Sequence, residues 1–342
     1  MDKHATDGQP GPAASHFAHG VVAATVTPYC QNGRIDLRAA SNLYRQLFSH
    51  GADGVFVASS TGEAEMLGEA DRESLVLTAC EASGGQRTVF VGVTSLGVGD
   101  TVRLANRMER AGADCGVVMA PAFLRYSQPE LVDYFWRIAD GSDLPIAVYH
   151  HPRATNSLDV ETIAILAGHP NIVALKDTSG TLARAMRLLQ AVEGTDIRVL
   201  QGSEHLVLES LSRGAAGMVT ALAGVVPDWH AALFQAWQQG DLKIAAEQQE
   251  RLIQLWQMFK IQALGDSMSN FTRALKVGIS RRGWLSDPAD LFPSANVPDE
   301  LLKNVEQLYD SAGIPAQGRI DSAHPGVDGP AAPRRASRSR LD

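Results

Sequence analysis

Eight short apolar runs, rich in β-branched residues, alternate with amphipathic stretches of helical periodicity along this chain. Continuous apolar runs between helices are typical of parallel strands that are covered on both faces. Eight such units close naturally into a (β/α)8, or TIM, barrel. We therefore predict an α/β TIM barrel with a C-terminal helical extension, and a doubly wound sheet is the alternative. The expected strands are residues 21–27, 54–59, 88–93, 115–120, 145–150, 172–176, 197–201 and 217–221.

Turn and capping residues punctuate the stretches between these runs. Asp36 and Ser127 are expected helix N-caps, because their side chains can accept a hydrogen bond from the first turn. Gly51, Gly84 and Gly112 stand where helices would end, since glycine adopts the left-handed conformation of a helix C-terminus. The pattern is thus locally consistent with strand–helix repeats.

The chain of 342 residues divides into four segments. Helical periodicity continues after the eighth run, over residues 228–240, 241–263, 267–281 and 298–310, and only the first of these helices is needed to close the barrel. The two ends are rich in glycine, proline and alanine, which is typical of disorder. The expected segments are a disordered N-terminus (1–16), the barrel (17–240), a helical extension (241–312) and a disordered tail (313–342).

Charge and cysteine content exclude several classes of function. A net charge of −8 argues against nucleic acid as the main partner, because phosphate binding requires a basic face. No apolar run is long enough to span a membrane, and residues 1–16 lack the apolar core of a secretory signal. The three cysteines, Cys30, Cys80 and Cys115, match no metal motif, and we expect them to be reduced in a cytoplasmic protein.

One lysine stands apart from all the others. The chain has lysines only at positions 3, 176, 243, 260, 276 and 303, so Lys176 is the single lysine between residues 4 and 242. It ends the sixth run, and the active site of a barrel lies at the carboxyl ends of its strands. A buried amine loses its proton more readily, and the neutral amine attacks carbonyls, which arginine cannot do. The alternative is a lysine that reaches past the strand end to a surface ion pair.

Two further strand ends carry groups suited to chemistry. Residues 59–63 read Ser-Ser-Thr-Gly-Glu, a turn whose backbone N–H groups and hydroxyls could hold a carboxylate. Tyr149 ends the fifth run, where a phenol could donate or accept a proton. Taken singly, each also fits an ordinary turn or a packed ring.

These features together resemble the dihydrodipicolinate synthase / N-acetylneuraminate lyase family of class I pyruvate-dependent aldolases. The resemblance covers about residues 19–310, and its motifs are specific in this order and spacing. The matching segments are the opening strand (20–28) and its turn (32–36), Ser60-Thr-Gly-Glu63 beside the family's Thr-Thr-Gly-Glu, Tyr149-His-His-Pro152 beside its Tyr-Asn-x-Pro, the lysine strand (172–177), Gln201-Gly-Ser-Glu204, and residues 214–219.

The resemblance implies a role for each matching residue. Lys176 would form an imine with the keto carbon of pyruvate or a related 2-oxo acid, so that no metal or organic cofactor is needed. Tyr149 would move protons, and Ser60 would relay or orient them. The residues implied to bind substrate or line the pocket are Thr61, Gly62, Phe123, His151, Gly202 and Val219. The resemblance also implies a homotetramer built as a dimer of dimers.

Three departures from the family pattern bear on the substrate. Phe123 replaces a tyrosine that in the synthases reaches the neighbouring subunit's site, so Tyr126 or a water would have to substitute for it. Ala154 replaces an arginine that holds the carboxylate of the aldehyde substrate, with Arg153 adjacent. His150 and His151 replace an asparagine and an apolar residue, and His151 shares the strand parity of Tyr149, so His151 either contacts substrate or is a structural histidine.

These departures favour an aldolase or lyase that reversibly cleaves a 2-keto-3-deoxy type acid to pyruvate and an aldehyde. A dehydratase of a keto-deoxy sugar acid and a 4-hydroxy-tetrahydrodipicolinate synthase are the enzymatic alternatives. A family member that binds a small acid without catalysis, and a phosphate-binding barrel enzyme, are alternatives of other kinds. A small-molecule 2-oxo acid is the expected partner, with neither nucleic acid nor membrane.

Overall fold

The computed structural model describes residues 18–30, 32–257, 268–286, 299–314 and 316. The predicted disordered N-terminus, 1–16, and nearly all of the predicted tail, 313–342, lie outside the described residues. The same holds for residues 258–263, the last part of one expected helix.

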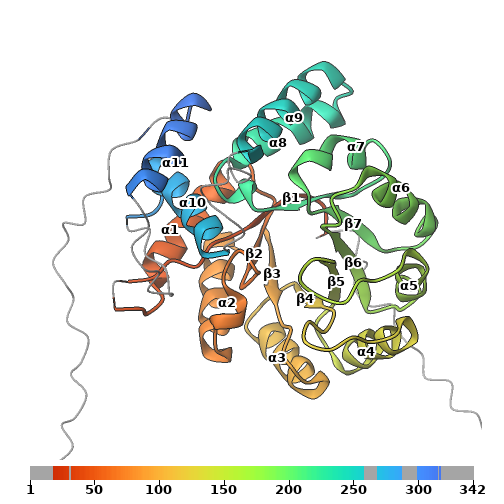
Figure 1. The fold of residues 1–342 in the computed structure, drawn as a ribbon. Helices are drawn as coiled ribbons and strands as arrows, with labels where there is room; N and C mark the ends of the chain where they lie inside the picture. Colours follow the sequence, from red (N-terminus) through yellow and green to blue (C-terminus); the bar gives the residue numbers. More distant parts are fainter. Residues whose placement is uncertain (1–17, 31, 258–267, 287–298, 315, 317–342) are drawn as a thin grey trace, which may run out of the picture.

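Eight parallel strands form one closed barrel in the order of the sequence (Figure 1). Each strand pairs with the next, and β1 pairs with β8 to complete the ring. The predicted TIM barrel is confirmed, and the doubly wound sheet is excluded. The strands are β1 (Gly20–Ala24), β2 (Gly54–Val57), β3 (Thr88–Gly92), β4 (Cys115–Met119), β5 (Ile146–His150), β6 (Ile172–Asp177), β7 (Arg198–Gln201) and β8 (Gly217–Thr220).

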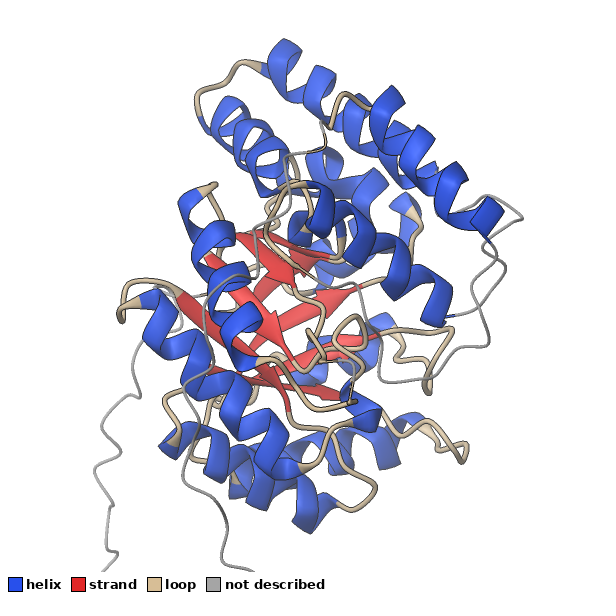
Figure 2. Cartoon of the chain, turned by 90° about the vertical axis from the view of Figure 1, so that its left-hand side faces the viewer, coloured by secondary structure: helices blue, strands red, loops and turns tan. Residues whose placement is uncertain are grey.

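Helices surround the strands, as Figure 2 shows from the side. Asp36 and Ser127 are the N-cap residues of α1 and α4, as expected. The Asp36 side chain accepts from the Ala39 N–H at 2.9 Å, whereas at Ser127 the Glu130 carboxylate accepts from the Ser127 N–H at 2.7 Å. The barrel helices are α1 (Leu37–Ser49), α2 (Glu69–Ser83), α3 (Val98–Arg110), α4 (Gln128–Gly141), α5 (Val160–Leu166), α6 (Leu182–Ala191), α7 (Val207–Leu211) and α8 (Pro227–Gln238).

Three more helices follow the barrel: α9 (Leu242–Gln257), α10 (Met268–Arg281) and α11 (Asp299–Ser311). In Figure 1, α10 and α11 lie on the α1 side of the barrel. The Asn42 amide on α1 donates to the carbonyl of Trp284, just after α10, at 2.8 Å. The end of α10 is therefore packed against the start of the barrel, whereas α9 packs against α8.

Side chains on β5, and on β6 from Ala174 onward, alternate between the barrel interior and the layer beneath the helices. Ala147 and Tyr149 belong to the interior cluster, whereas Ile146 and Val148 belong to the cluster between strands and helices. One register shift between β5 and β6 occurs near Ile146, after which the strands stay paired to their ends. Because successive strand residues face opposite ways, the residue after each inward side chain faces the helices.

Candidate active site

A cavity of about 2200 Å³ opens at the carboxyl ends of the strands. This is the end of the barrel at which TIM-barrel enzymes place their chemistry. Of the nine predicted site residues, the structure brings eight to the wall of this cavity, and Gly62 is the exception. The eight are Ser60, Thr61, Phe123, Tyr149, His151, Lys176, Gly202 and Val219.

Lys176 lies inside the barrel, not on its surface. The residue is 6% exposed, and its Nζ lies 4.1 Å from the centroid of the Tyr149 ring and 5.1 Å from that of Phe56. Among the residues that the structure describes, no carboxylate lies within ion-pair distance of this amine. The surface ion pair that the sequence left open is therefore absent here, and the amine faces the cavity.

Gly202 leaves the space that the lysine side chain occupies. A Cβ at this position would lie 2.2 Å from the Thr178 Oγ1 and 3.3 Å from the Lys176 Cε. Any larger residue would push one of these side chains away from the cavity. Gly202, directly after β7, therefore contributes to the site by having no side chain, which leaves room for Thr178 and Lys176.

Tyr149 and Lys176 are direct partners in the β5–β6 ladder. Tyr149 is 3% exposed, and its ring packs edge-on against Phe56, with 6.5 Å between the ring centroids. Two adjacent strands therefore present a phenol and an amine side by side, which is the arrangement required for proton transfer next to a lysine adduct.

The turn after β2 is held in an uncommon backbone conformation. Ala58 and Glu63, which flank it, have φ angles of 47° and 59°. The left-handed region costs a residue with a Cβ about 1–2 kcal/mol. Among the described backbone groups, none accepts from the N–H of Ser60 or Thr61, so both N–H groups are available to an anion.

Gly62 has a different place from the one predicted. Its N–H is directed at Ser59, 2.9 Å from the carbonyl and 3.2 Å from the Oγ, and its carbonyl accepts from the Thr27 hydroxyl at 2.7 Å. A Cβ here would lie 3.0 Å from the Thr25 carbonyl oxygen. Gly62 therefore shapes the turn against β1, because its polar groups are already used within the protein.

A buried ion pair connects this turn to the helical extension. The Lys276 Nζ on α10 lies 3.1 Å from the Glu63 Oε2, and the Lys276 side chain is fully buried. The same amine lies 4.8 Å from the centroid of the Tyr29 ring. Sequence reasoning missed this pair, because the two residues are 213 positions apart and Lys276 lies on a helix outside the strand–helix repeats.

His151 is a neutral hydrogen-bonding group at the cavity wall. Its ring meets Tyr149 edge-on, with 5.6 Å between the ring centroids, and among the described residues its buried Nδ1 has no hydrogen-bond partner. Burial lowers the pKa of His151 to about 4, and the positive charges of Lys176 and Arg153 act in the same direction. A neutral imidazole with an unused nitrogen is suited to contact a substrate.

We expect the pKa of His151 to rise in a Lys176→Met variant, because Lys176 is the charged neighbour that lowers this pKa most. An NMR titration of the imidazole ring measures this, and an unchanged pKa would show that Lys176 does not act on His151.

Since an unfolded histidine titrates near 6.5, the stability that depends on neutral His151 is complete above that pH and is lost as the pH falls toward 4.

The sequence did not single out Thr178 or His205, which also line the cavity. The Thr178 Oγ1 and the His205 Nδ1 are buried and have no partner among the described residues. Thr178 follows Lys176 by two positions, so strand alternation could have identified it. His205 lies in a short 3₁₀ helix, Glu204–Leu206, and no pattern in the sequence marks it.

Comparison with known proteins decides the family. The model of the dihydrodipicolinate synthetase family matches residues 17–311. The chain belongs to this family. It is accordingly an enzyme, a lyase of the class I aldolase type.

Relatives within the dihydrodipicolinate synthetase family match most of the chain. A 4-hydroxy-tetrahydrodipicolinate synthase of Corynebacterium urealyticum is 33% identical over 88% of this chain and 97% of its own. The corresponding synthase 1 of Streptomyces coelicolor is 35% identical over 68% of this chain and 75% of its own. The fold matches that of YagE, an E. coli K12 prophage protein of the family solved with pyruvate, at a TM-score of 0.81, 24% identity and 86% and 99% coverage.

The departures from the family pattern lie at the cavity rim. Phe123 is 92% exposed there, and Tyr126, 41% exposed, donates its backbone N–H to the Asn156 side chain at 3.0 Å. Ala154 and Arg153 both line the cavity. The loss of the arginine at position 154 therefore leaves a guanidinium one residue away on the same wall.

Within the described part of the chain, no helix is long and apolar enough to cross a bilayer. Among those residues there is also no group of three histidine, cysteine or acidic side chains placed to hold a metal ion. All three cysteines are unpaired.

Proposed function

We propose that this enzyme forms a Schiff base between Lys176 and a 2-oxo acid and reversibly cleaves a 2-keto-3-deoxy type acid to pyruvate and an aldehyde. The observation that carries the proposal is the position of the amine. It lies at the carboxyl end of β6, inside the barrel, against Tyr149 and facing a cavity. YagE, a structural neighbour, was solved with pyruvate, which supports this class of substrate.

The reaction follows from what each group can do. The Lys176 amine adds to the keto carbon, and water leaves to give an iminium. Tyr149 gives its proton to the departing water, and the resulting phenolate takes the proton of the C4 hydroxyl as the C3–C4 bond breaks. The electron pair of that bond moves to the iminium nitrogen. The aldehyde departs, the enamine is protonated at C3, and hydrolysis frees pyruvate and the amine.

The polar groups around Lys176 and Tyr149 are suited to bind the carboxylate and the hydroxyl groups of the substrate. The free N–H groups of Ser60 and Thr61 would bind the carboxylate of the 2-oxo acid, and the Ser60 hydroxyl would orient the proton on Tyr149. The unused atoms of Thr178, His205 and His151 are hydrogen-bonding groups. Since buried polar atoms favour hydrogen-bonded partners, these atoms suit the hydroxyl groups of a keto-deoxy acid.

Product analysis tests the proposal against the other enzymatic alternative with the same imine. We would incubate the enzyme with a panel of 2-keto-3-deoxy acids and identify the products by mass spectrometry. Pyruvate with an aldehyde is the expected result, whereas a dioxo acid would assign the enzyme as a dehydratase. Absence of turnover across the whole panel would contradict both.

A second candidate is the activity named for the curated relatives, 4-hydroxy-tetrahydrodipicolinate synthase. The observation that favours it is Arg153, which places a cation at the wall where the synthases use an arginine for the carboxylate of the aldehyde. Ala154 and Phe123 weigh against it, because they remove the groups that the family pattern places at those two positions.

Arg153→Ala separates these two candidates. A hydrogen bond to a charged group contributes about 1.5–3 kcal/mol, so the KM of an aldehyde with a second carboxylate should rise about 10-fold or more if Arg153 binds it. The KM of a hydroxylated aldehyde without that carboxylate should change little. Steady-state kinetics in the condensation direction with both aldehydes measures the difference, and equal changes would remove Arg153 from substrate selection.

The remaining features follow from the same proposal. The imine itself supplies the electron sink, so the reaction needs no metal or organic cofactor, and we place the enzyme in the cytoplasm. We also propose a homotetramer of paired dimers. The exposed apolar side chains of Leu96, Phe123 and Leu124 at the cavity rim support self-association, since such clusters mark contact surfaces. Light scattering coupled to gel filtration would measure the assembly.

A further inference from the structure

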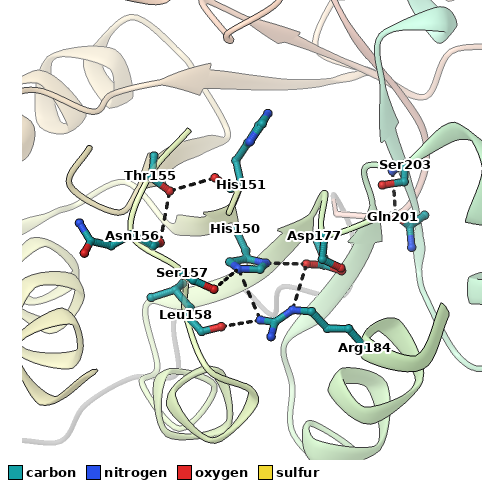
Figure 3. A network of polar contacts seen from close by, with 11 residues as sticks. His150, His151, Thr155, Asn156, Ser157, Leu158, Asp177, Arg184, Gln201 and Ser203 are labelled. Carbon is teal, nitrogen blue, oxygen red and sulfur yellow. Dashed lines mark hydrogen bonds and ion pairs between the residues drawn. The ribbon is translucent and has the colours of Figure 1, made fainter. Parts of the chain in front are cut away.

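A second polar cluster lies behind the cavity, on the outer face of the same two strands (Figure 3). His150 and Asp177 directly follow Tyr149 and Lys176, and they are also partners in the β5–β6 ladder. The His150 Nδ1 lies 2.8 Å from the Asp177 Oδ1, and the two side chains are 1% and 2% exposed. The reaction proposed above uses neither residue.

Three further groups complete this cluster. Ser179 donates its hydroxyl to the Asp177 Oδ2 at 2.7 Å. Arg184 on α6 places its Nε 4.0 Å from the Asp177 Oδ1 and donates through Nη2 to the Leu158 carbonyl. The His150 Nε2 faces the Ser157 hydroxyl at 3.4 Å and the Arg184 Nη2 at 3.5 Å.

The donors and acceptors in this cluster determine the state of the imidazole. Arginine only donates hydrogen bonds, so the His150 Nε2 accepts where it faces Arg184. The Nδ1–H then donates to Asp177, and the carboxylate is balanced by the guanidinium. The hydrogen bonds of His150, Asp177 and Ser179 make this part of the cluster rigid, whereas the buried Arg184 Nε has no hydrogen-bond partner among the described residues. The cluster also connects the β5–α5 loop, through Ser157 and Leu158, to the β6–α6 loop, through Ser179.

We propose that His150 and Asp177 are positioning residues that hold the Tyr149 hydroxyl in reach of the carbon next to the Lys176 imine. This inference depends on the proposed Schiff-base function. Each member of the pair is bonded through the backbone to one of the two reacting residues, so their 2.8 Å contact adds a side-chain bond between the two strand ends at the last pair of the ladder. A misplacement of about 1 Å can cost roughly 100-fold in rate, so small movements here would be measurable.

The test compares proton transfer with imine formation in the same protein. We would measure exchange of the pyruvate methyl protons in D₂O by NMR, and the fraction of enzyme that borohydride traps at saturating pyruvate. His150→Phe should lower exchange about 10- to 100-fold, the scale of a displaced catalytic group, and leave the trapped fraction nearly unchanged. His150→Asn should retain most of the exchange, because the Asn Nδ2 occupies the place of the His Nδ1.

His169→Phe is the matched control, since His169 pairs with Asp140 at 3.0 Å near the other end of β6. It should change neither readout. Arg184→Met, at a side chain that is 22% exposed, tests the same cluster if His150→Phe does not fold, and should lower exchange by a smaller factor. Unchanged exchange in both His150→Phe and Arg184→Met, or equal losses in His150→Asn and His150→Phe, would overturn the positioning role. Failure of the wild-type enzyme to form any adduct would instead overturn the proposed function.

Discussion

Lys176→Ala is expected to abolish turnover and to remove the adduct that borohydride traps with pyruvate. Loss of a covalent nucleophile lowers kcat by at least about 10⁴-fold. Lys176→Arg should be equally inactive, because it keeps the charge but cannot supply a neutral amine. Lys243, an exposed lysine on α9, gives the matched control Lys243→Ala, which should keep full trapping.

Peptide mapping locates the adduct without ambiguity. Trypsin cleaves after unmodified Lys176, and a reduced pyruvyl adduct blocks that cleavage. The treated wild-type protein should therefore lose peptides 154–176 and 177–184 and yield one peptide, 154–184, with the added mass. An adduct on another lysine, or equal trapping in Lys176→Ala, would contradict the assignment.

Lys276→Met is expected to lower the free energy of unfolding by about 3–5 kcal/mol, because removing one partner breaks the buried ion pair in which the amine lies 3.1 Å from the Glu63 carboxylate. The Ser60–Thr61 turn should loosen as well, because Glu63 closes that turn. Urea unfolding followed by circular dichroism, at one protein concentration, measures the stability, and the KM for pyruvate reports on the turn.

The double variant Glu63→Gln/Lys276→Met separates the pair from the packing around it. Its loss of stability should be clearly smaller than the sum of the two single losses, because each single change already breaks the same ion pair. Additive losses, or a loss below about 0.5 kcal/mol for Lys276→Met, the level of an ordinary surface substitution, would show that the pair does not hold the extension to the turn.

Much of the fold could be predicted because each strand–helix unit carries its own local signal. The apolar runs, the Asp36 cap and the glycines after α1, α2 and α3 all follow from near-neighbour chemistry. The position of α10 against α1 and the β2 turn could not be predicted in this way. It depends on contacts such as Asn42 with Trp284, which are 242 residues apart.

In the candidate site too, residues placed by local sequence signals could be predicted and residues placed by distant contacts could not. The strand-end rule placed Lys176, Tyr149 and the Ser60–Thr61 turn at one cavity wall, because it depends only on knowing where the strands end. It failed for Gly62, whose polar groups are used inside the turn, and for His205, whose place depends on a 3₁₀ helix. Three-dimensional packing decides which backbone N–H groups have no partner within the protein, and the spacing of residues along the sequence does not predict it.

The alternation along β5 and β6 has a consequence for attempts to redesign this enzyme. Neighbouring codons specify side chains on opposite sides of the barrel wall: Tyr149 and Lys176 inside, His150 and Asp177 outside. A mutant library that varies only residues in contact with a ligand would leave the outer pair untouched. Selections for new substrates would therefore gain from sampling each inner position together with the next residue along its strand.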